Sequence, residues 1–215
     1  MSSPAGNETS QERERARDFD RLLTFVDAIV AIAVTLLVLP LVDVVGRLHG
    51  EYDDSVGALL RGQHALIGAF FLSFVVIANL WLTQHRMLRH VVATNELLTR
   101  LLVAWTLTIV FLPFPTALVA GPGSSGGQAV TKLLYVGTMA VSSILLGLID
   151  LVVTRHPALR DSEEAPDALR AFATAGAFLV ALGAMLLIPP TSYWPLLLLL
   201  VSDRVVDLYR RTVTA

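Results

Sequence analysis

The segment from Phe25 to Leu41, FVDAIVAIAVTLLVLPL, decides the fold of this chain. It is apolar almost throughout, with one aspartate (Asp27) near its start and one threonine (Thr35) in its middle. A helix on the surface of a soluble protein would carry a broad polar face, which this segment lacks. A membrane-spanning helix needs about 20 mostly apolar residues. The segment therefore predicts a membrane span, and its two polar side chains need an explanation.

The composition of the whole chain agrees with a membrane protein. Of its 215 residues, 54% are hydrophobic and 16% are charged, and the mean hydropathy is +0.66. The net charge of -2 gives no overall field that favours nucleic acid. The absence of cysteine excludes disulfides, thiolate metal sites and cysteine nucleophiles. We expect an integral membrane protein whose surroundings are a lipid bilayer.

Six apolar blocks follow one another along the chain. They cover about residues 22–45, 58–84, 97–119, 130–153, 169–188 and 196–208. Strands of a membrane barrel would alternate in polarity over about ten residues, whereas these blocks are continuously apolar and longer. The sequence predicts an all-α membrane protein with six transmembrane helices.

The charged residues suggest how the chain is oriented in the membrane. Residues 1–19 are polar, do not resemble a signal peptide and are expected to form a disordered or fraying cytoplasmic tail, followed by a single six-span domain over 20–215. With six spans, most arginines fall on the side of the two termini, while the other side holds only Arg47, Arg61 and Lys132. Basic residues favour the cytoplasmic side. Both termini are therefore expected in the cytoplasm, in a multi-pass protein of the cell membrane.

A helical wheel separates the two polar residues of the opening segment. Ile32, Leu36, Leu39 and Asp43 fall on one stripe, with Thr35 and Phe25 at its edges, and Asp27 lies on roughly the opposite side. A carboxylate inside a span is costly unless it has a partner, so Asp27 is expected to meet another helix. A threonine is tolerated more readily because its hydroxyl can bond a backbone carbonyl of its own helix.

Three stretches resemble the transmembrane protein 175 family of potassium channels. RLLTFVDAIVAIAVTLLVLP, from Arg21 to Pro40, resembles the family pattern R-x-x-x-F-S-D followed by A-I-x-x-T-L-L-V-L. SFVVIANLWLTQHRML (73–88) and FLPFPTAL (111–118) resemble the second span and the end of the third span. The resemblance covers about half of the chain. The last three spans match the family only in their number and hydropathy.

The resemblance implies a passive potassium channel that needs no cofactor. Bacterial members are similar six-span proteins that form homotetramers, with the first helix of each subunit lining a central pore and no T-V-G-Y-G filter. By motif position, the resemblance places the pore constriction on Ile32, followed by Leu36 and Leu39, and a hydroxyl layer on Thr35. A ring of such apolar side chains can act as a hydrophobic gate. From the wheel, Asp43 would add a ring of carboxylates at the outer mouth.

The resemblance also implies a hydrogen-bond network that braces the cytoplasmic half of the first span. The chain keeps the arginine, aspartate and tryptophan of that network as Arg21, Asp27 and Trp81. The family serine is replaced by Val26, and the family histidine falls on Gln84, with His85 one place later. Gln84, His85 or Asn95 is expected to supply the missing hydrogen-bond partners.

Three other functions are alternatives to a channel. An enzyme is not expected, because the five histidines are scattered and no nucleophile lies beside a base. A secondary transporter would favour an internal repeat and helices broken near the membrane midplane, and neither is apparent. A non-conducting membrane assembly protein that shares the fold is the third alternative, since fold alone does not determine function.

Overall fold

The computed structural model describes residues 4–48, 63–120 and 128–159. Every element in these ranges is a helix: α1 (Pro4–Leu36), α2 (Leu39–Leu48), α4 (His64–Leu88), α5 (Glu96–Phe111), α6 (Pro113–Ala120), α7 (Gln128–Arg155) and a short 3-10 helix, η1 (Pro157–Leu159). Within the described residues, four stretches are long and apolar enough to cross a membrane: Ala16–Asp43, Leu66–Leu88, Glu96–Leu118 and Val130–Arg155. The first four predicted spans are therefore confirmed as helices, and the fifth and sixth lie outside the described residues.

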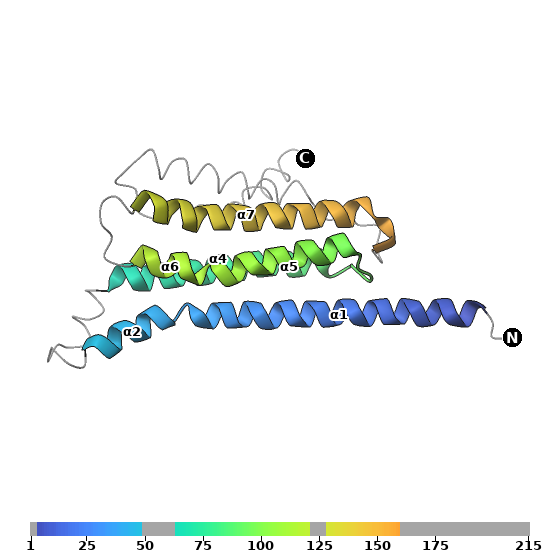
Figure 1. The fold of residues 1–215 in the computed structure, drawn as a ribbon, viewed down its shortest axis with the longest axis horizontal. Coiled ribbons are helices and arrows are strands. Elements are labelled where there is room, and N and C mark those ends of the chain that lie inside the picture. The colour runs from blue at the N-terminus through green and yellow to red at the C-terminus, as the bar shows by residue number, and fades with distance from the viewer. Residues whose placement is uncertain (1–3, 49–62, 121–127, 160–215) are drawn as a thin grey trace, which may run out of the picture.

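The helix α1 begins far earlier than expected. It is continuous from Pro4 to Leu36 and projects beyond the other helices at its N-terminal end (Figure 1). From Pro4 onward the structure thus has a regular helix where a disordered or fraying tail is expected from the sequence. Glutamine, glutamate, arginine and alanine dominate residues 11–17, and all four are good helix formers. The side chain of Phe19 is buried, so the packed core also begins before residue 20.

A break separates α1 from α2 within the first span. The N–H of Leu37 donates to the carbonyl of Val34 at 3.3 Å, and that of Val38 to the carbonyl of Thr35 at 3.2 Å, so the helix tightens to three-residue turns. Pro40 has no N–H to donate to the carbonyl of Leu36. The chain consequently bends before α2, as Figure 1 shows.

The third span is also interrupted by proline. It consists of α5 and α6, which meet at Leu112, and the N–H of Leu112 reaches the carbonyl of Ile109 at 3.3 Å. Pro113 and Pro115 each lack the N–H that a regular helix would use at this point. The interruption lies at one end of the span, as the positions of the two prolines in the sequence predict.

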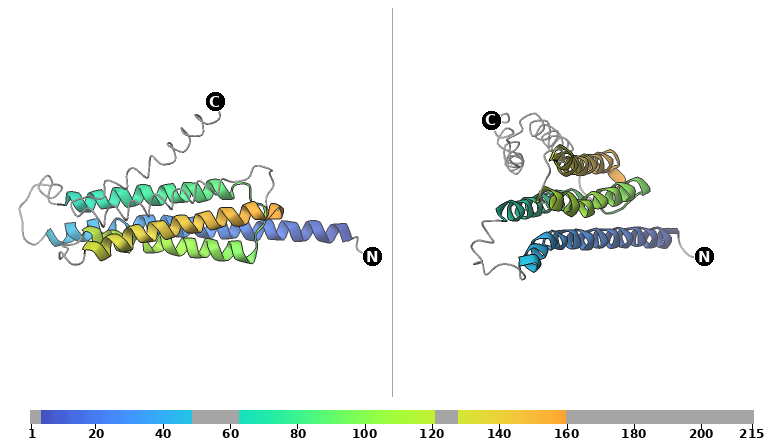
Figure 2. Two further views of the ribbon diagram at one scale, coloured as in Figure 1. Left: turned by 90° about the horizontal axis from the view of Figure 1, so that it is seen from above. Right: turned by 60° about the vertical axis from the view of Figure 1, so that its left-hand side comes forward.

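The core is centred on α5. This helix packs against α7 on one side and α1 on the other, while α6 packs against α4 and α7. Figure 1 and the right-hand view of Figure 2 show α1 at the edge of the bundle. The largest fully buried side chains of α5 are Leu98, Leu102, Trp105 and Ile109. Because α5 occupies the middle, α1 contacts the bundle along one face only.

A chain of hydroxyl groups joins α4, α6 and α7 near the end of the bundle opposite the N-terminus. The Thr116 hydroxyl donates to the carbonyl of Leu112 at 2.8 Å, so its oxygen accepts the proton of Ser73, 2.9 Å away. Ser73 in turn accepts from the hydroxyl of Tyr135 at 2.8 Å, because each hydroxyl carries a single hydrogen. In an apolar environment, such bonds hold helices together where the hydrophobic effect cannot.

Candidate pore-lining face

The helix α1 has two faces with opposite environments. The face toward the bundle is buried and consists of Phe19, Val26, Val30, Ala33 and, just after the helix, Leu37. The opposite face is exposed although it is largely apolar. Only 22% of the first span's most apolar window is buried, against 56% for the span of α7. An exposed apolar face of this length needs lipid or another protein surface to cover it.

The predicted constriction residues all lie on the exposed face. Ile32 is 58% exposed, Leu39 is 51% exposed and Leu36 is 38% exposed. Ile32 and Leu36 belong to α1, whereas Leu39 is the first residue of α2, beyond the break. The structure therefore leaves these side chains free to meet the same residues of other copies. Their role as a constriction stays a prediction.

The hydroxyl of Thr35 is exposed on the same side of α1. It donates to the backbone carbonyl of Ile32 at 2.7 Å, which confirms that the hydroxyl is satisfied within its own helix. Its single proton is used in that bond, and the lone pairs of its oxygen point away from the donor direction. Thr35 can therefore offer an oxygen to a cation or a water molecule without breaking a bond.

Asp43 lies in α2 and its side chain is exposed. Because the helix breaks at Leu37 and Val38, the wheel drawn for α1 does not carry over to α2 without an offset. The structure does not test the proposed carboxylate ring, and the role of Asp43 stays a prediction.

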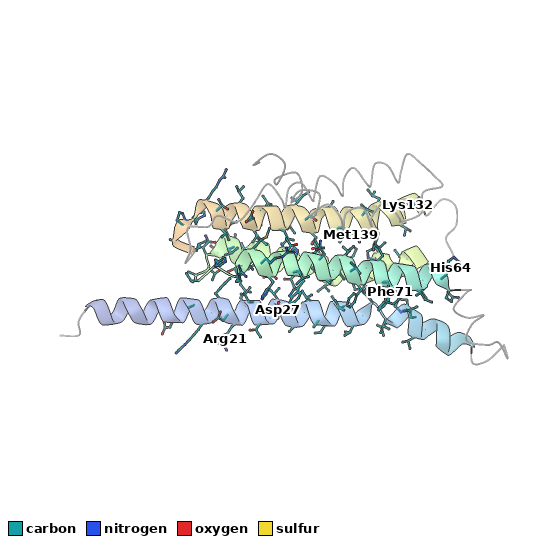
Figure 3. The ribbon with its side chains drawn as sticks, turned by 180° about the vertical axis from the view of Figure 1, so that it is seen from behind. Arg21, Asp27, His64, Phe71, Lys132 and Met139 are labelled. Carbon is teal, nitrogen blue, oxygen red and sulfur yellow. The ribbon has the colours of Figure 1, made fainter. Side chains whose placement is uncertain are left out.

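Asp27 faces the bundle and meets α4. Its Oδ1 accepts a hydrogen bond from Nε1 of Trp81 at 2.8 Å, so the expectation that Asp27 pairs with another helix is confirmed. The ring of His85 stacks on Trp81 with centroids 5.6 Å apart and an angle of 31° between the planes. Figure 3 shows Asp27 on the side of α1 toward the bundle and Arg21 on the far side.

The other predicted members of the network lie elsewhere. Arg21 is exposed, and nothing in the described part of the chain bonds it to Asp27 or Trp81. Asn95 caps α5 instead, with its side-chain oxygen accepting from the N–H of Leu98 at 2.7 Å. Gln84 is buried, and its Oε1 accepts no hydrogen bond within the described residues. The structure thus brings together Asp27, Trp81 and His85.

The hydroxyl chain of Ser73, Thr116 and Tyr135 is not predicted from the sequence. Its signal was available as three hydroxyl-bearing residues inside otherwise apolar spans. Their spacing in the sequence does not show that they meet. The three residues belong to three different helices, and Ser73 is 43 residues from Thr116 and 62 residues from Tyr135.

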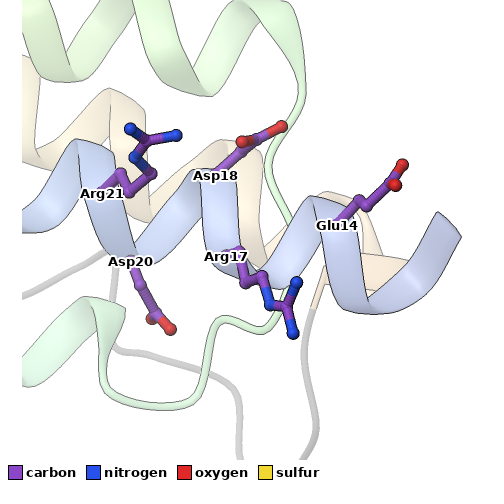
Figure 4. A pocket seen from close by; sticks show the side chains of 5 residues that line it. All are labelled: Glu14, Arg17, Asp18, Asp20 and Arg21. Carbon is purple, nitrogen blue, oxygen red and sulfur yellow. The ribbon is translucent and has the colours of Figure 1, made fainter. Parts of the chain in front are cut away.

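A shallow charged hollow lies beside the N-terminal part of α1. It is lined by Glu14, Arg17, Asp18, Asp20 and Arg21, and Figure 4 shows these side chains around the helix. Across residues 4–48, 63–120 and 128–159, no group of three or more histidine, aspartate or glutamate side chains is placed to hold a metal ion. The hollow has open sides and a mixture of both charges, so it does not enclose a small ligand.

The comparisons with known proteins point to one family. Residues 21–113 match the family described as "Endosomal/lysosomal potassium channel TMEM175". A human protein named "Endosomal/lysosomal proton channel TMEM175" is 28% identical over 116 residues, which cover 54% of this chain and 22% of that protein. A protein of Streptomyces collinus named a potassium channel is 29% identical over 103 residues, 46% of this chain and 47% of that protein. The matches to the human and Streptomyces proteins thus cover less than half of each relative's length.

A solved structure extends the similarity to most of the fold. It is described as the crystal structure of a lysosomal potassium-selective channel TMEM175 homologue from Chamaesiphon minutus. The TM-score is 0.64 at 24% identity, and the match covers 90% of this chain and 96% of that one. The resemblance to the family is confirmed. The relatives are named as ion channels, which agrees with the expectation of a protein that is neither an enzyme nor dependent on a cofactor.

Proposed function

Because the chain resembles the TMEM175 channels through its first three spans, we propose that it is a cation channel that passes potassium passively across the cell membrane. Four copies surround a central pore, and α1 of each copy lines it. Ile32 forms the hydrophobic gate with Leu36 and Leu39 beyond it, and Thr35 supplies the oxygen layer. Asp43 lies at the outer mouth.

The exposed apolar face of α1 is the observation that carries this proposal. The opposite face of the helix packs on the bundle, so α1 is held in place while Ile32 remains 58% exposed. A ring of four isoleucines excludes water and thereby stops ions until the ring widens. The pair Asp27–Trp81 supports the gate from behind, because it fixes the rotation of α1 about its own axis.

Potassium flux into proteoliposomes that contain purified protein tests the proposal. Ile32→Asn makes the gate polar and is expected to raise the flux above that of the wild type, with a preference for potassium over sodium. Leu107→Asn is the matched control: Leu107 is 67% exposed but belongs to α5. The same flux change in both variants would contradict a gate at Ile32.

The same preparation separates the alternatives. An absence of flux in both the wild type and Ile32→Asn, under conditions in which a known channel conducts, would favour a transporter or a non-conducting assembly protein. Several animal relatives are named as proton channels, so proton flux is measured in parallel with a pH-sensitive dye. A proton flux without potassium flux would replace potassium as the proposed ion.

A further inference from the structure

The exposed face of α1 continues past the membrane span toward the N-terminus. At about 1.5 Å per residue, the 33 residues of α1 span roughly 50 Å, which is longer than the roughly 30 Å hydrocarbon core of a bilayer. Figures 1 and 2 show this extra length projecting beyond the ends of the other helices. About three turns of α1, from Pro4 to the start of the candidate span at Ala16, therefore extend beyond that span.

One series of exposed residues with heptad spacing runs along α1 from just before the first span into its middle. Alternating steps of four and three residues select a series of positions that are all exposed: Glu14, Asp18, Arg21, Phe25, Ala28, Ile32 and Thr35. Such spacing keeps one seam of a helix turned toward partner helices in a coiled coil, with a drift of about 20° per heptad for a straight helix. The seam that holds Ile32 thus includes three charged residues at its N-terminal end.

The charges at the start of the first span suit contact between parallel copies of the same helix. Residues 14–21 contain three acidic residues (Glu14, Asp18, Asp20) and three arginines (Arg15, Arg17, Arg21), so the segment is neutral. Figure 4 shows Glu14, Asp18 and Arg21 on one side of the helix, with Arg17 and Asp20 on the other. Four carboxylates at one height repel one another, but arginines at neighbouring heights on the adjacent copies offset that repulsion.

We propose that residues 14–21 form a charged collar in which the α1 helices of neighbouring copies pair through Asp18 of one copy and Arg21 of the next. The occupant of this surface is a second copy of the chain, arranged in parallel. The collar rests on the proposed tetramer and deepens it, because it adds an assembly contact at the N-terminal end of the first span. Asp18 lies 14 residues before Ile32, about 21 Å along the helix, so the collar acts on the spacing of the helices and not on the gate itself.

Cysteine crosslinking tests the collar, because the chain has no cysteine of its own. Asp18→Cys is expected to form covalent oligomers on oxidation in the membrane. Asp20→Cys is the matched control: it makes the same charge change two residues away, is also exposed, and lies on the other side of the helix. It is expected to remain a monomer. Equal crosslinking of the two variants would overturn the collar.

A third variant separates the collar from the tetramer on which it rests. Ile32→Cys is expected to crosslink through the gate. Crosslinking at Ile32 without crosslinking at Asp18 would reject the collar alone, and crosslinking at neither position would reject the central pore as well.

The charge pairing has its own test by native mass spectrometry in detergent. Asp18→Arg is expected to lower the tetramer fraction at low salt, and the swapped pair Asp18→Arg with Arg21→Asp to restore it. The difference should vanish near 1 M salt, where the Debye length falls to about 3 Å. If the tetramer fraction changes neither with the charge reversal nor with the salt concentration, pairing at the collar is contradicted.

Discussion

Asp27 and Thr35 share one apolar helix but depend on different surroundings. Asp27 needs a partner from outside its helix, because a carboxylate in lipid is expensive, and Trp81 provides one at 2.8 Å. Thr35 needs no partner from another helix, because its hydroxyl donates a hydrogen bond to the carbonyl of Ile32. The same two residues thus mark the two faces of α1: Asp27 the face toward the bundle and Thr35 the exposed one. At the scale of the residue, the few polar side chains of an apolar helix thus indicate which face is turned toward the bundle and which is exposed.

The bond between Asp27 and Trp81 gives the first prediction. Trp81→Phe removes the donor but keeps an aromatic ring, and we expect a loss of about 0.6 kcal/mol and at most about 1.7 kcal/mol, the average and the maximum found for side-chain hydrogen bonds in a membrane protein. Asp27→Asn keeps an acceptor oxygen and should cost less. Stability is measured by unfolding the protein in detergent. The double variant Trp81→Phe with Asp27→Leu completes the cycle. If its loss of unfolding free energy equals the sum of the losses of the two single variants, the two side chains are not coupled.

The oxygen of Thr35 gives the second prediction. Thr35→Val keeps the shape and removes the hydroxyl, and a hydrogen-bonding group is worth about 0.5–1.5 kcal/mol, which corresponds to a change of roughly two- to tenfold. We expect the ratio of potassium to sodium permeability to fall by that factor, as read from reversal potentials. Thr35→Ser retains the hydroxyl and should stay near the wild type. An unchanged ratio in Thr35→Val would exclude this hydroxyl from ion selection.

At the scale of the element, hydropathy predicts spans well and helix starts poorly. The first four spans were predicted because a helix in lipid must be apolar over its whole length. The start of α1 at Pro4 was not, because residues 4–20 lack apolar periodicity, and good helix formers alone do not distinguish a helix from a charged tail. The cap of α5 was predictable, since asparagine followed by an acidic residue before an apolar run is a helix-start signal.

The hydroxyl chain that links α4, α6 and α7 gives the third prediction. Ser73→Ala removes the group that joins Thr116 to Tyr135, and we expect it to lower the unfolding free energy by about 1 kcal/mol. Ser143→Ala is the matched control, because Ser143 is equally buried in α7 but its hydroxyl has no hydrogen-bond partner among the described residues. That control should be neutral or slightly stabilising, since it removes an unsatisfied polar atom. Equal losses in the two variants would mean that lost packing, and not the hydroxyl chain, sets the cost.

At the scale of the whole molecule, the sequence could not show which candidate partners complete the network around Asp27. The sequence pattern allowed Gln84, His85 or Asn95 as a hydrogen-bond partner in this network. Asn95 is committed to the first turn of α5, and the ring of His85 rests on Trp81. Such choices depend on how α1, α4 and α5 are rotated against one another, which is set by the packing of side chains far apart in the sequence. The exposed face of α1 is visible only after this packing is known.

The two ends of the bundle carry different charges, and this gives the last prediction. The end with the start of α1 also holds the connection between α4 and α5 and the end of α7, which Val92 and Leu159 tie together by a backbone bond of 2.9 Å. Arg86, Arg89, Arg100 and Arg155 are exposed there, whereas Lys132 and His64 lie toward the opposite end (Figure 3). Because basic residues favour the cytoplasm, the N-terminal end of the bundle should face inward.

Single cysteines in the cysteine-free chain test this orientation in intact cells. Val130→Cys, at the start of α7, is expected to react with a membrane-impermeant maleimide added outside. Val92→Cys, in the connection after α4, should react only after lysis, and both side chains are exposed enough for the reagent. The wild type, which has no cysteine, gives the background. The reverse pattern would place the N-terminal end of α1 outside the cell, and the proposed collar would then lie at the outer entrance of the pore.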